Sequence, residues 1–182
     1  MRVITGTAKG RKLLAPEGLD TRPTSDMAKE AIFSILQFEL EGALVLDLFA
    51  GSGQLGIEAL SRGARGAIFI DSSREAQATI LSNLDKTGLR AAARVSQMDA
   101  AMFLRGTQEQ FDIALLDPPY GTGLISQALP LLVDHMNPGG LILCETERNE
   151  ILPDSAGIFT EKREYRYGKA KVTTYRRVEE AR

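Results

Sequence analysis

The chain has 182 residues, an apolar content of 43% and a formal net charge of −2. This length favours one domain over residues 1–182, and the slightly acidic charge argues against a non-specific nucleic-acid binder. No run approaches the roughly 20 apolar residues of a membrane span, so we expect no membrane contact. A single cysteine and a single histidine exclude an internal disulfide and the usual zinc site, and predict a metal-free protein of the reducing cytoplasm.

The first part of the chain predicts a small N-terminal β/helix extension over residues 1–42. Two short β-like runs, Arg2–Thr5 and Arg11–Leu14, come first. A helix is expected over 24–42, because apolar residues recur there at helical spacing. Thr24 is its expected cap, and Gly42 is expected to end it.

From residue 43 onward, strand and helix patterns alternate in what we expect to be the catalytic core, residues 43–182. The predicted strands are Ala43–Phe49, Gly66–Ile70, Ala92–Gln97, Phe111–Leu116 and Gly140–Thr146, and the predicted helices are Gln54–Ser61, Ser73–Thr87, Asp99–Leu104 and Leu124–His135. Such alternation predicts an α/β fold with a doubly wound, mostly parallel, Rossmann-like sheet and helices on both faces. Ile158–Tyr167 and Lys171–Arg177 are expected to add an antiparallel C-terminal strand pair, which completes seven strands.

Acidic residues lie at or just beyond the ends of four of the predicted strands. They are Asp47, Asp71, Asp99 and Asp117. Each could simply cap the next helix. Ligands in open α/β sheets bind outside the carboxyl ends of the strands, however, and four acids at corresponding positions favour a ligand site there.

The segment from Gly51 to Gly56 matches the pattern G-x-G-x-x-G, and Asp71 lies 20 residues after Gly51. This pattern is typical of dinucleotide binding, so NAD is one candidate. Asp47 argues against NAD, because a carboxylate offers nothing to an anionic pyrophosphate. It would suit a ligand that carries an ammonium group.

S-adenosylmethionine satisfies these positions better than NAD does. Its amino group could bind Asp47, and its ribose hydroxyls could bind Asp71. Adenine N6 could donate to Asp99 while the Ala100 amide donates to N1. The predicted cofactor-binding residues are Asp47, Phe49, Ala50, Gly51, Ser52, Gly53, Asp71, Ser72, Asp99 and Ala100.

The tetrapeptide Asp117-Pro118-Pro119-Tyr120 follows the fourth strand, and its two prolines rigidify the loop. An exocyclic amine on an aromatic ring is a poor nucleophile. The Asp117 carboxylate and the Pro118 carbonyl could accept its two hydrogens and orient its lone pair at a methyl donor. Tyr120 offers a face for base stacking, so the four residues predict methylation of an unpaired or flipped base. A rigid turn with no catalytic role is the alternative.

Basic residues gather near both ends of the chain. Seven lie between Lys162 and Arg177, and Lys9, Arg11, Lys12 and Arg22 lie near the start. A basic face on an acidic protein suits a phosphate backbone. Lysine and arginine also protect edge strands from unwanted pairing, and charge alone does not decide between these interpretations.

The whole pattern resembles the RsmD family. The resemblance rests on Met1–Gly6, Lys9–Leu13, Arg22–Asp26, Lys29–Phe33 and Asp47–Gly53, together with the DPPY tetrapeptide, and it covers nearly the whole chain. It implies a class I methyltransferase fold, with S-adenosylmethionine converted to S-adenosylhomocysteine. It also implies a guanine N2 target in bacterial 16S ribosomal RNA, met in the small subunit or in an assembly intermediate.

Within this resemblance, the predicted catalytic residues are Asp117, Pro118, Pro119 and Tyr120. The predicted RNA contacts are Lys9, Arg11, Lys12, Arg22, Thr24 and Lys29. The chain departs from the family at two places. Members often carry Glu where this chain has Asp71, and Arg-Val-Arg near Met27-Ala28-Lys29, and the loss of two arginines weakens the case for RNA contacts by the N-terminal residues.

Two further functions stay open at this point. Adenine-N6 methyltransferases use the same tetrapeptide, so the motif alone does not choose the base. A catalytically silent RNA-binding assembly protein could use the same fold, because fold does not imply activity. A monomer is expected for the single predicted active site.

Overall fold

The computed structural model describes residues 1–17 and 25–178. Its strands are β1 (Leu44–Leu48), β2 (Gly66–Asp71), β3 (Ala93–Gln97), β4 (Phe111–Leu116), β5 (Met136–Glu147), β6 (Glu161–Tyr167) and β7 (Ala170–Arg176). Its α-helices are α1 (Asp26–Leu36), α2 (Gln54–Ser61), α3 (Arg74–Thr87), α4 (Ala100–Gly106) and α5 (Leu124–Leu132), and short 3-10 turns cover Arg90–Ala92 and Val133–His135.

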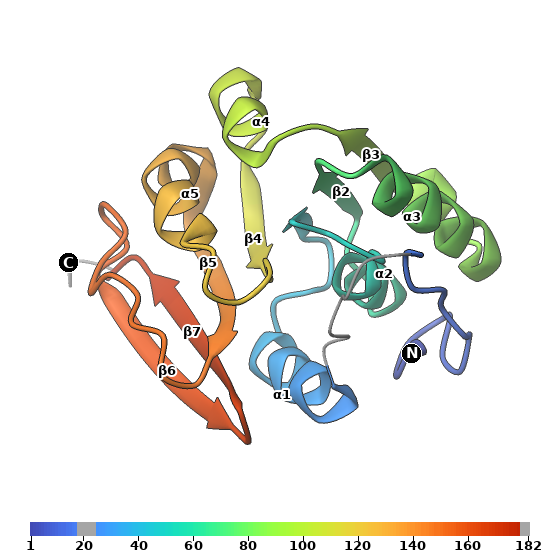
Figure 1. The fold of residues 1–182 in the computed structure, drawn as a ribbon, viewed down its shortest axis with the longest axis horizontal. Coiled ribbons are helices and arrows are strands. Elements are labelled where there is room, and N and C mark those ends of the chain that lie inside the picture. The colour runs from blue at the N-terminus through green and yellow to red at the C-terminus, as the bar shows by residue number, and fades with distance from the viewer. Residues whose placement is uncertain (18–24, 179–182) are drawn as a thin grey trace.

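All seven strands form one sheet in the order β3-β2-β1-β4-β5-β7-β6 (Figure 1). The first five strands in that order are parallel, and β7 runs antiparallel between β5 and β6. The order reverses between β1 and β4, which is the position where open α/β sheets bind ligands. The predicted doubly wound, mostly parallel sheet with an antiparallel C-terminal pair is confirmed.

Helices cover both faces of the sheet, as Figure 1 shows. Successive strand side chains alternate between faces, so Val45 packs with α1, α2 and α3, while Leu46 packs with α4 and α5. The same alternation holds in β2, where Phe69 joins the first cluster and Ile70 the second. Both faces are apolar, which explains why the central strands read as continuous hydrophobic runs.

Three N-terminal predictions need correction. The expected β-like runs contribute only an isolated antiparallel bridge between Arg2 and Lys12. Helix α1 ends at Leu36, not at Gly42, because the chain turns back so that Leu40 can enter the core at 2% exposure. The cap is Ser25, whose side chain accepts from the Ala28 amide. Thr24, the expected cap, lies outside the described residues.

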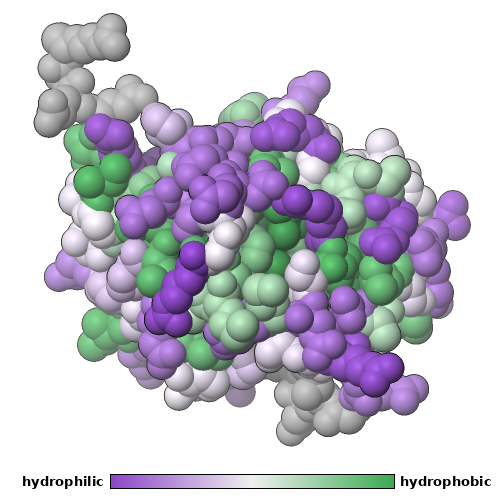
Figure 2. All heavy atoms as spheres, turned by 90° about the horizontal axis from the view of Figure 1, so that it is seen from above, coloured by the Kyte–Doolittle hydropathy of each residue, from purple (hydrophilic) through white to green (hydrophobic). Residues whose placement is uncertain are grey.

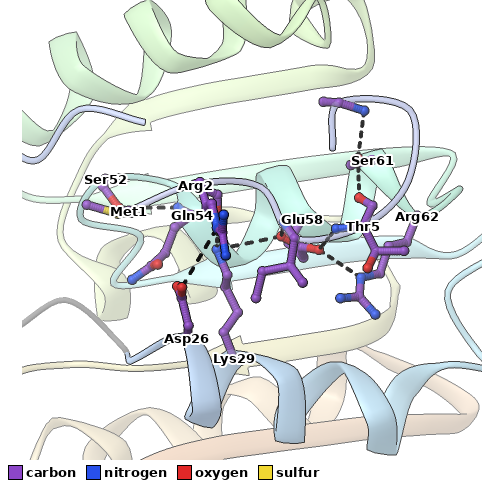
Figure 3. A network of polar contacts seen from close by, with 12 residues as sticks. Met1, Arg2, Thr5, Asp26, Lys29, Ser52, Gln54, Glu58, Ser61 and Arg62 are labelled. Carbon is purple, nitrogen blue, oxygen red and sulfur yellow. Dashed lines mark hydrogen bonds and ion pairs between the residues drawn. The ribbon is translucent and has the colours of Figure 1, made fainter. Parts of the chain in front are cut away.

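The N-terminal segment, residues 1–14, lies against α2 and α3. The Ile4 and Thr5 amides donate to the two carboxylate oxygens of Glu58, each at 2.9 Å. Ser61 donates to the Thr5 carbonyl (Figure 3). A Cβ atom at Gly6 would lie 1.8 Å from the Ser61 carbonyl oxygen, so only glycine fits this crossing. This segment is therefore attached to the first helices of the core.

Figure 2 shows one face of the molecule, on which hydrophilic residues divide the hydrophobic ones into small groups. Among residues 1–17 and 25–178, no helix has both the length and the apolar character needed to cross a membrane.

Candidate active site

A cavity of about 620 Å³ lies where β1, β2 and β4 end. It is bordered by all four residues of the DPPY loop (Asp117–Tyr120). The predicted cofactor-binding residues that line it are Asp47, Phe49, Ala50, Gly51, Ser52, Asp71, Ser72, Asp99 and Ala100. Gly53 is not among the lining residues. The tertiary structure thus brings the predicted catalytic loop and the predicted cofactor residues to one hollow.

Strand geometry explains why the acids converge. Asp47 lies between Leu46 and Leu48, which pack with α4 and α5, so its side chain projects to the opposite face of the sheet. Asp71 and Asp117 directly follow Ile70 and Leu116, which pack in that same α4/α5 cluster. In the described part of the chain, no three His, Cys, Asp or Glu side chains are grouped in a way that could hold a metal ion.

Asp47 is a buried carboxyl group at 1% exposure. Its Oδ2 accepts a hydrogen bond of 2.9 Å from the Gly56 amide at the start of α2. Burial raises the pKa of Asp47 well above its usual value, and the nearby Asp117 and Asp71 raise it further, against the opposing effect of the Gly56 hydrogen bond. Such a group gains stability from a cationic partner.

The glycine loop between β1 and α2 is tied to the end of β2. Gly51 donates its amide to Asp71 Oδ2 at 2.9 Å, and Ser73 donates to Asp71 Oδ1 at 2.9 Å. Gly53, the residue before α2, is in the left-handed conformation, with φ of 78°. A Cβ at Gly56 would lie 2.3 Å from the Phe69 ring, so this third glycine permits close packing of helix and strand.

Phe49 is the only non-glycine residue with positive φ in the described part of the chain, at 69°. This conformation costs on the order of 1 kcal/mol or more for a bulky side chain. Phe49 stands at the turn that leads from β1 into the glycine loop, and it borders the cavity. Backbone strain is therefore located at the entrance to the predicted cofactor loop.

Asp99 has the capping role considered for it from the sequence. Its side chain caps α4 by accepting from the Met102 amide at 3.0 Å, and it also lines the cavity. A carboxylate offers about four lone-pair sites, so one capping bond leaves capacity for a ligand.

The DPPY loop is anchored to β5 and to itself. The Tyr120 hydroxyl donates to Glu145 Oε1 at 3.3 Å, and Thr122 donates to the Pro119 carbonyl at 2.8 Å. Pro118 is buried, while Asp117 and Tyr120 are half-buried. The loop thus presents two polar side chains at the wall of the cavity.

Several cavity residues were not anticipated from the sequence. They are Met1, Pro16, Gln54, Leu55, Ile70, Ser73, Met98, Leu124 and Glu145. Met1 reaches the glycine loop, where its sulfur accepts from the Ser52 hydroxyl at 3.2 Å (Figure 3). Glu145 could have been found, because it lies near the end of a predicted strand, like the four aspartates. No local signal marks Met1 or Pro16.

The predicted RNA contacts divide into three groups. Lys9, Arg11 and Lys12 are exposed and remain available to a partner. Arg22 and Thr24 lie outside the described residues. The prediction for Lys29 is wrong, because its side chain is fully buried 3.6 Å from Glu58 and donates to the Arg2 carbonyl (Figure 3). Burial lowers the pKa of Lys29, and Glu58 opposes that effect.

Comparison with known proteins places this chain among close relatives. The family model described as "Conserved hypothetical protein 95" matches residues 1–176. Bacillus subtilis YlbH is 40% identical over 182 residues, which covers 97% of this chain and 99% of that protein. The Escherichia coli protein named "Ribosomal RNA small subunit methyltransferase D" is 36% identical and covers 97% of this chain and 90% of its own length.

The fold is shared as well. The solved structure of Escherichia coli yhhF superimposes with a TM-score of 0.83 at 36% identity, and the match covers 97% of each chain.

Proposed function

The chain belongs to the family described as Conserved hypothetical protein 95, the RsmD family, and from this premise we propose that it methylates a guanine N2 amine in 16S ribosomal RNA. S-adenosylmethionine is the proposed donor. The observation that carries the proposal is that Asp47, Asp71 and Asp99 line the same cavity as the glycine loop and the DPPY loop.

The cavity residues fit the proposed cofactor. S-adenosylmethionine would supply a methyl group on a positively charged sulfonium, with S-adenosylhomocysteine as the product. Asp47, a buried carboxyl group whose pKa is raised mainly by burial, would accept from the cofactor's ammonium group. Asp71 already accepts two backbone amides, and its remaining lone pairs would accept from the ribose hydroxyls.

The adenine end would lie against α4. Asp99 would accept from adenine N6, and the Ala100 amide at the start of α4 would donate to N1. Amides in the first turn of a helix have no partner within the helix, so this donor is supplied by the fold.

The DPPY loop would orient the target amine. Asp117 and the Pro118 carbonyl would accept the two hydrogens of the amine, which directs its lone pair toward the methyl group and stabilises the positive charge that develops on nitrogen. Tyr120, held through its hydroxyl by Glu145, would stack on the base. The base must be unpaired or flipped out to reach this position.

The proposed substrate rests on the family and on the surface of the N-terminal segment. A close relative is named as acting on the small-subunit ribosomal RNA. The exposed Lys9, Arg11 and Lys12 would bind its phosphates, either in the small subunit or in an assembly intermediate. We propose a cytoplasmic monomer that needs no metal.

Incubation with labelled S-adenosylmethionine tests the function directly. Naked ribosomal RNA, small subunits and DNA would be offered in parallel, followed by nucleoside mass spectrometry. We expect N2-methylguanosine from RNA. N6-methyladenine from DNA would support the adenine enzyme instead, and no transfer to any substrate would support the silent assembly protein.

A further inference from the structure

Glu145 is a second carboxylate beside the DPPY loop. It lies on β5 at 4% exposure and borders the same cavity as Asp117 and Tyr120. The Tyr120 hydroxyl donates to its Oε1 at 3.3 Å. Its position at the wall of the active site makes it a candidate contact for the substrate.

The register of the sheet places Glu145 next to Asp117. Leu116 on β4 pairs with Cys144 on β5, and Asp117 and Glu145 are the residues that directly follow this pair. Leu116 and Cys144 both pack against the α4/α5 side of the sheet. Asp117 and Glu145 are each one position further and therefore project to the opposite side together.

We propose that Glu145 selects guanine by accepting the hydrogen on guanine N1. This inference rests on the proposed function and adds the residue that reads the base. The two hydrogens of the N2 amine are assigned to Asp117 and the Pro118 carbonyl, and guanine carries its N1 hydrogen directly beside that amine. An acceptor is needed there, and Glu145 is the adjacent carboxylate on the cavity wall.

The same carboxylate rejects the other amino bases. In adenine and cytosine the ring nitrogen beside the exocyclic amine is an acceptor, so its lone pair would face a negative charge. A site built around a specific hydrogen bond discriminates strongly against a base that cannot make it. A carboxylate has about four lone-pair sites, so it can accept from more than one donor. The DPPY loop would then supply the chemistry, and Glu145 the choice of base.

A base analogue provides the test. The small-subunit RNA would carry, at the target position, either guanosine or 2-aminopurine riboside, which retains the N2 amine but has an unprotonated N1. Methyl transfer to each would be compared for the native enzyme and for Glu145→Gln, whose amide can donate to an unprotonated N1. The analogue also lacks O6, but this loss is common to both enzymes and cancels in the comparison.

We expect the native enzyme to prefer guanosine and Glu145→Gln to reduce the ratio of kcat/KM for guanosine over 2-aminopurine by at least about tenfold. The matched control is Glu147→Gln, an exposed position on the same strand, which should keep the native ratio. Calorimetry should give the native Kd for S-adenosylmethionine in both variants.

Two results would overturn the inference, and they are distinguishable. If Glu145→Gln slows both substrates equally, the ratio stays unchanged and Glu145 has only a structural role. If the native enzyme transfers no methyl group to guanosine, the proposed function fails, and this inference fails with it.

Discussion

The backbone N–H of Gly56 donates a hydrogen bond of 2.9 Å to Oδ2 of Asp47. The contact joins the first turn of α2 to the end of β1, and it is made to a side chain of only 1% exposure. One hydrogen bond does not offset the burial of a charge, so the pKa of Asp47 remains raised, mainly by burial. In the proposed enzyme, a bound cationic ligand would offset the free-energy cost of burying the Asp47 carboxylate.

Replacing Asp47 with asparagine is expected to raise the stability of the ligand-free protein at neutral pH. The folded-state pKa of Asp47 lies above its unfolded value of about 3.9. Folding therefore favours the protonated form, and stability is lost as pH rises through the folded pKa. Asparagine can still accept from the Gly56 amide, and it does not ionise. The Tm of Asp47→Asn should therefore exceed that of the native protein by an amount that grows from pH 4 upward. A Tm difference that is constant with pH would contradict this prediction.

The same variant should bind S-adenosylmethionine more weakly. Loss of a charge-assisted hydrogen bond costs about 1.5–3 kcal/mol, or roughly a 10- to 150-fold increase in Kd. Calorimetry at neutral pH measures this, and an unchanged Kd would remove Asp47 from the cofactor site. For the native protein, affinity should fall as the pH is lowered through the raised pKa of Asp47, because the protonated group no longer attracts the ammonium.

Asp71→Ala should weaken cofactor binding by roughly 10-fold or more, because it removes the proposed ribose acceptor and also frees the Gly51 and Ser73 amides. Asp85→Ala, an exposed position on α3, serves as the control and should keep the native Kd. Equal Kd values for the two variants would refute the assignment of Asp71.

Asp117→Ala should abolish methyl transfer while S-adenosylmethionine still binds. Loss of one group that stabilises developing charge costs about 10²–10³ in kcat, and loss of orientation adds to it. Single-turnover assays with labelled cofactor measure the rate, and calorimetry measures binding. Native activity in this variant would exclude the proposed role of the DPPY loop.

Lys29→Met should lower the free energy of unfolding by up to about 3 kcal/mol, because it leaves the Glu58 carboxylate buried with one cation fewer. Arg62 and the Ile4 and Thr5 amides still bind Glu58, so we expect less than the full loss of a buried pair. Urea denaturation measures this, with the exposed Lys86→Met as control. RNA affinity should be unchanged where the variant is folded. If Lys29→Met reduced the salt dependence of RNA binding, Lys29 would have to contact an RNA phosphate, and this prediction would be wrong.

Alanine substitution of Lys9, Arg11 or Lys12 should weaken RNA binding and leave the Kd for S-adenosylmethionine unchanged, because all three side chains are exposed. Each lost phosphate contact should reduce the slope of log K against log salt by about 1. Filter binding across a salt series gives this slope. If all three variants kept the slope of the native protein, the RNA would bind to another surface.

Much of the architecture is determined by local pattern. Helix α2 has the predicted bounds, Gln54–Ser61, and α3 is capped by Ser73 and ends before Gly88. The hydrophobic strand runs predict a sheet covered on both faces, and acids at strand ends predict a ligand site where the strands finish. These features depend on residues close together in the chain, so the sequence alone determines them.

Only the tertiary structure decided the remainder. From the sequence, Lys29 is expected to be an exposed basic residue. In the structure it is buried beside Glu58, which lies on another helix. Met1 becomes part of the cavity because Glu58 and Ser61 hold the N-terminal segment against α2. Glu145 gains its place beside Asp117 from the pairing of β4 with β5. Each of these depends on contacts between residues far apart in the chain, where burial and neighbouring charge, not residue type, set the role of a side chain.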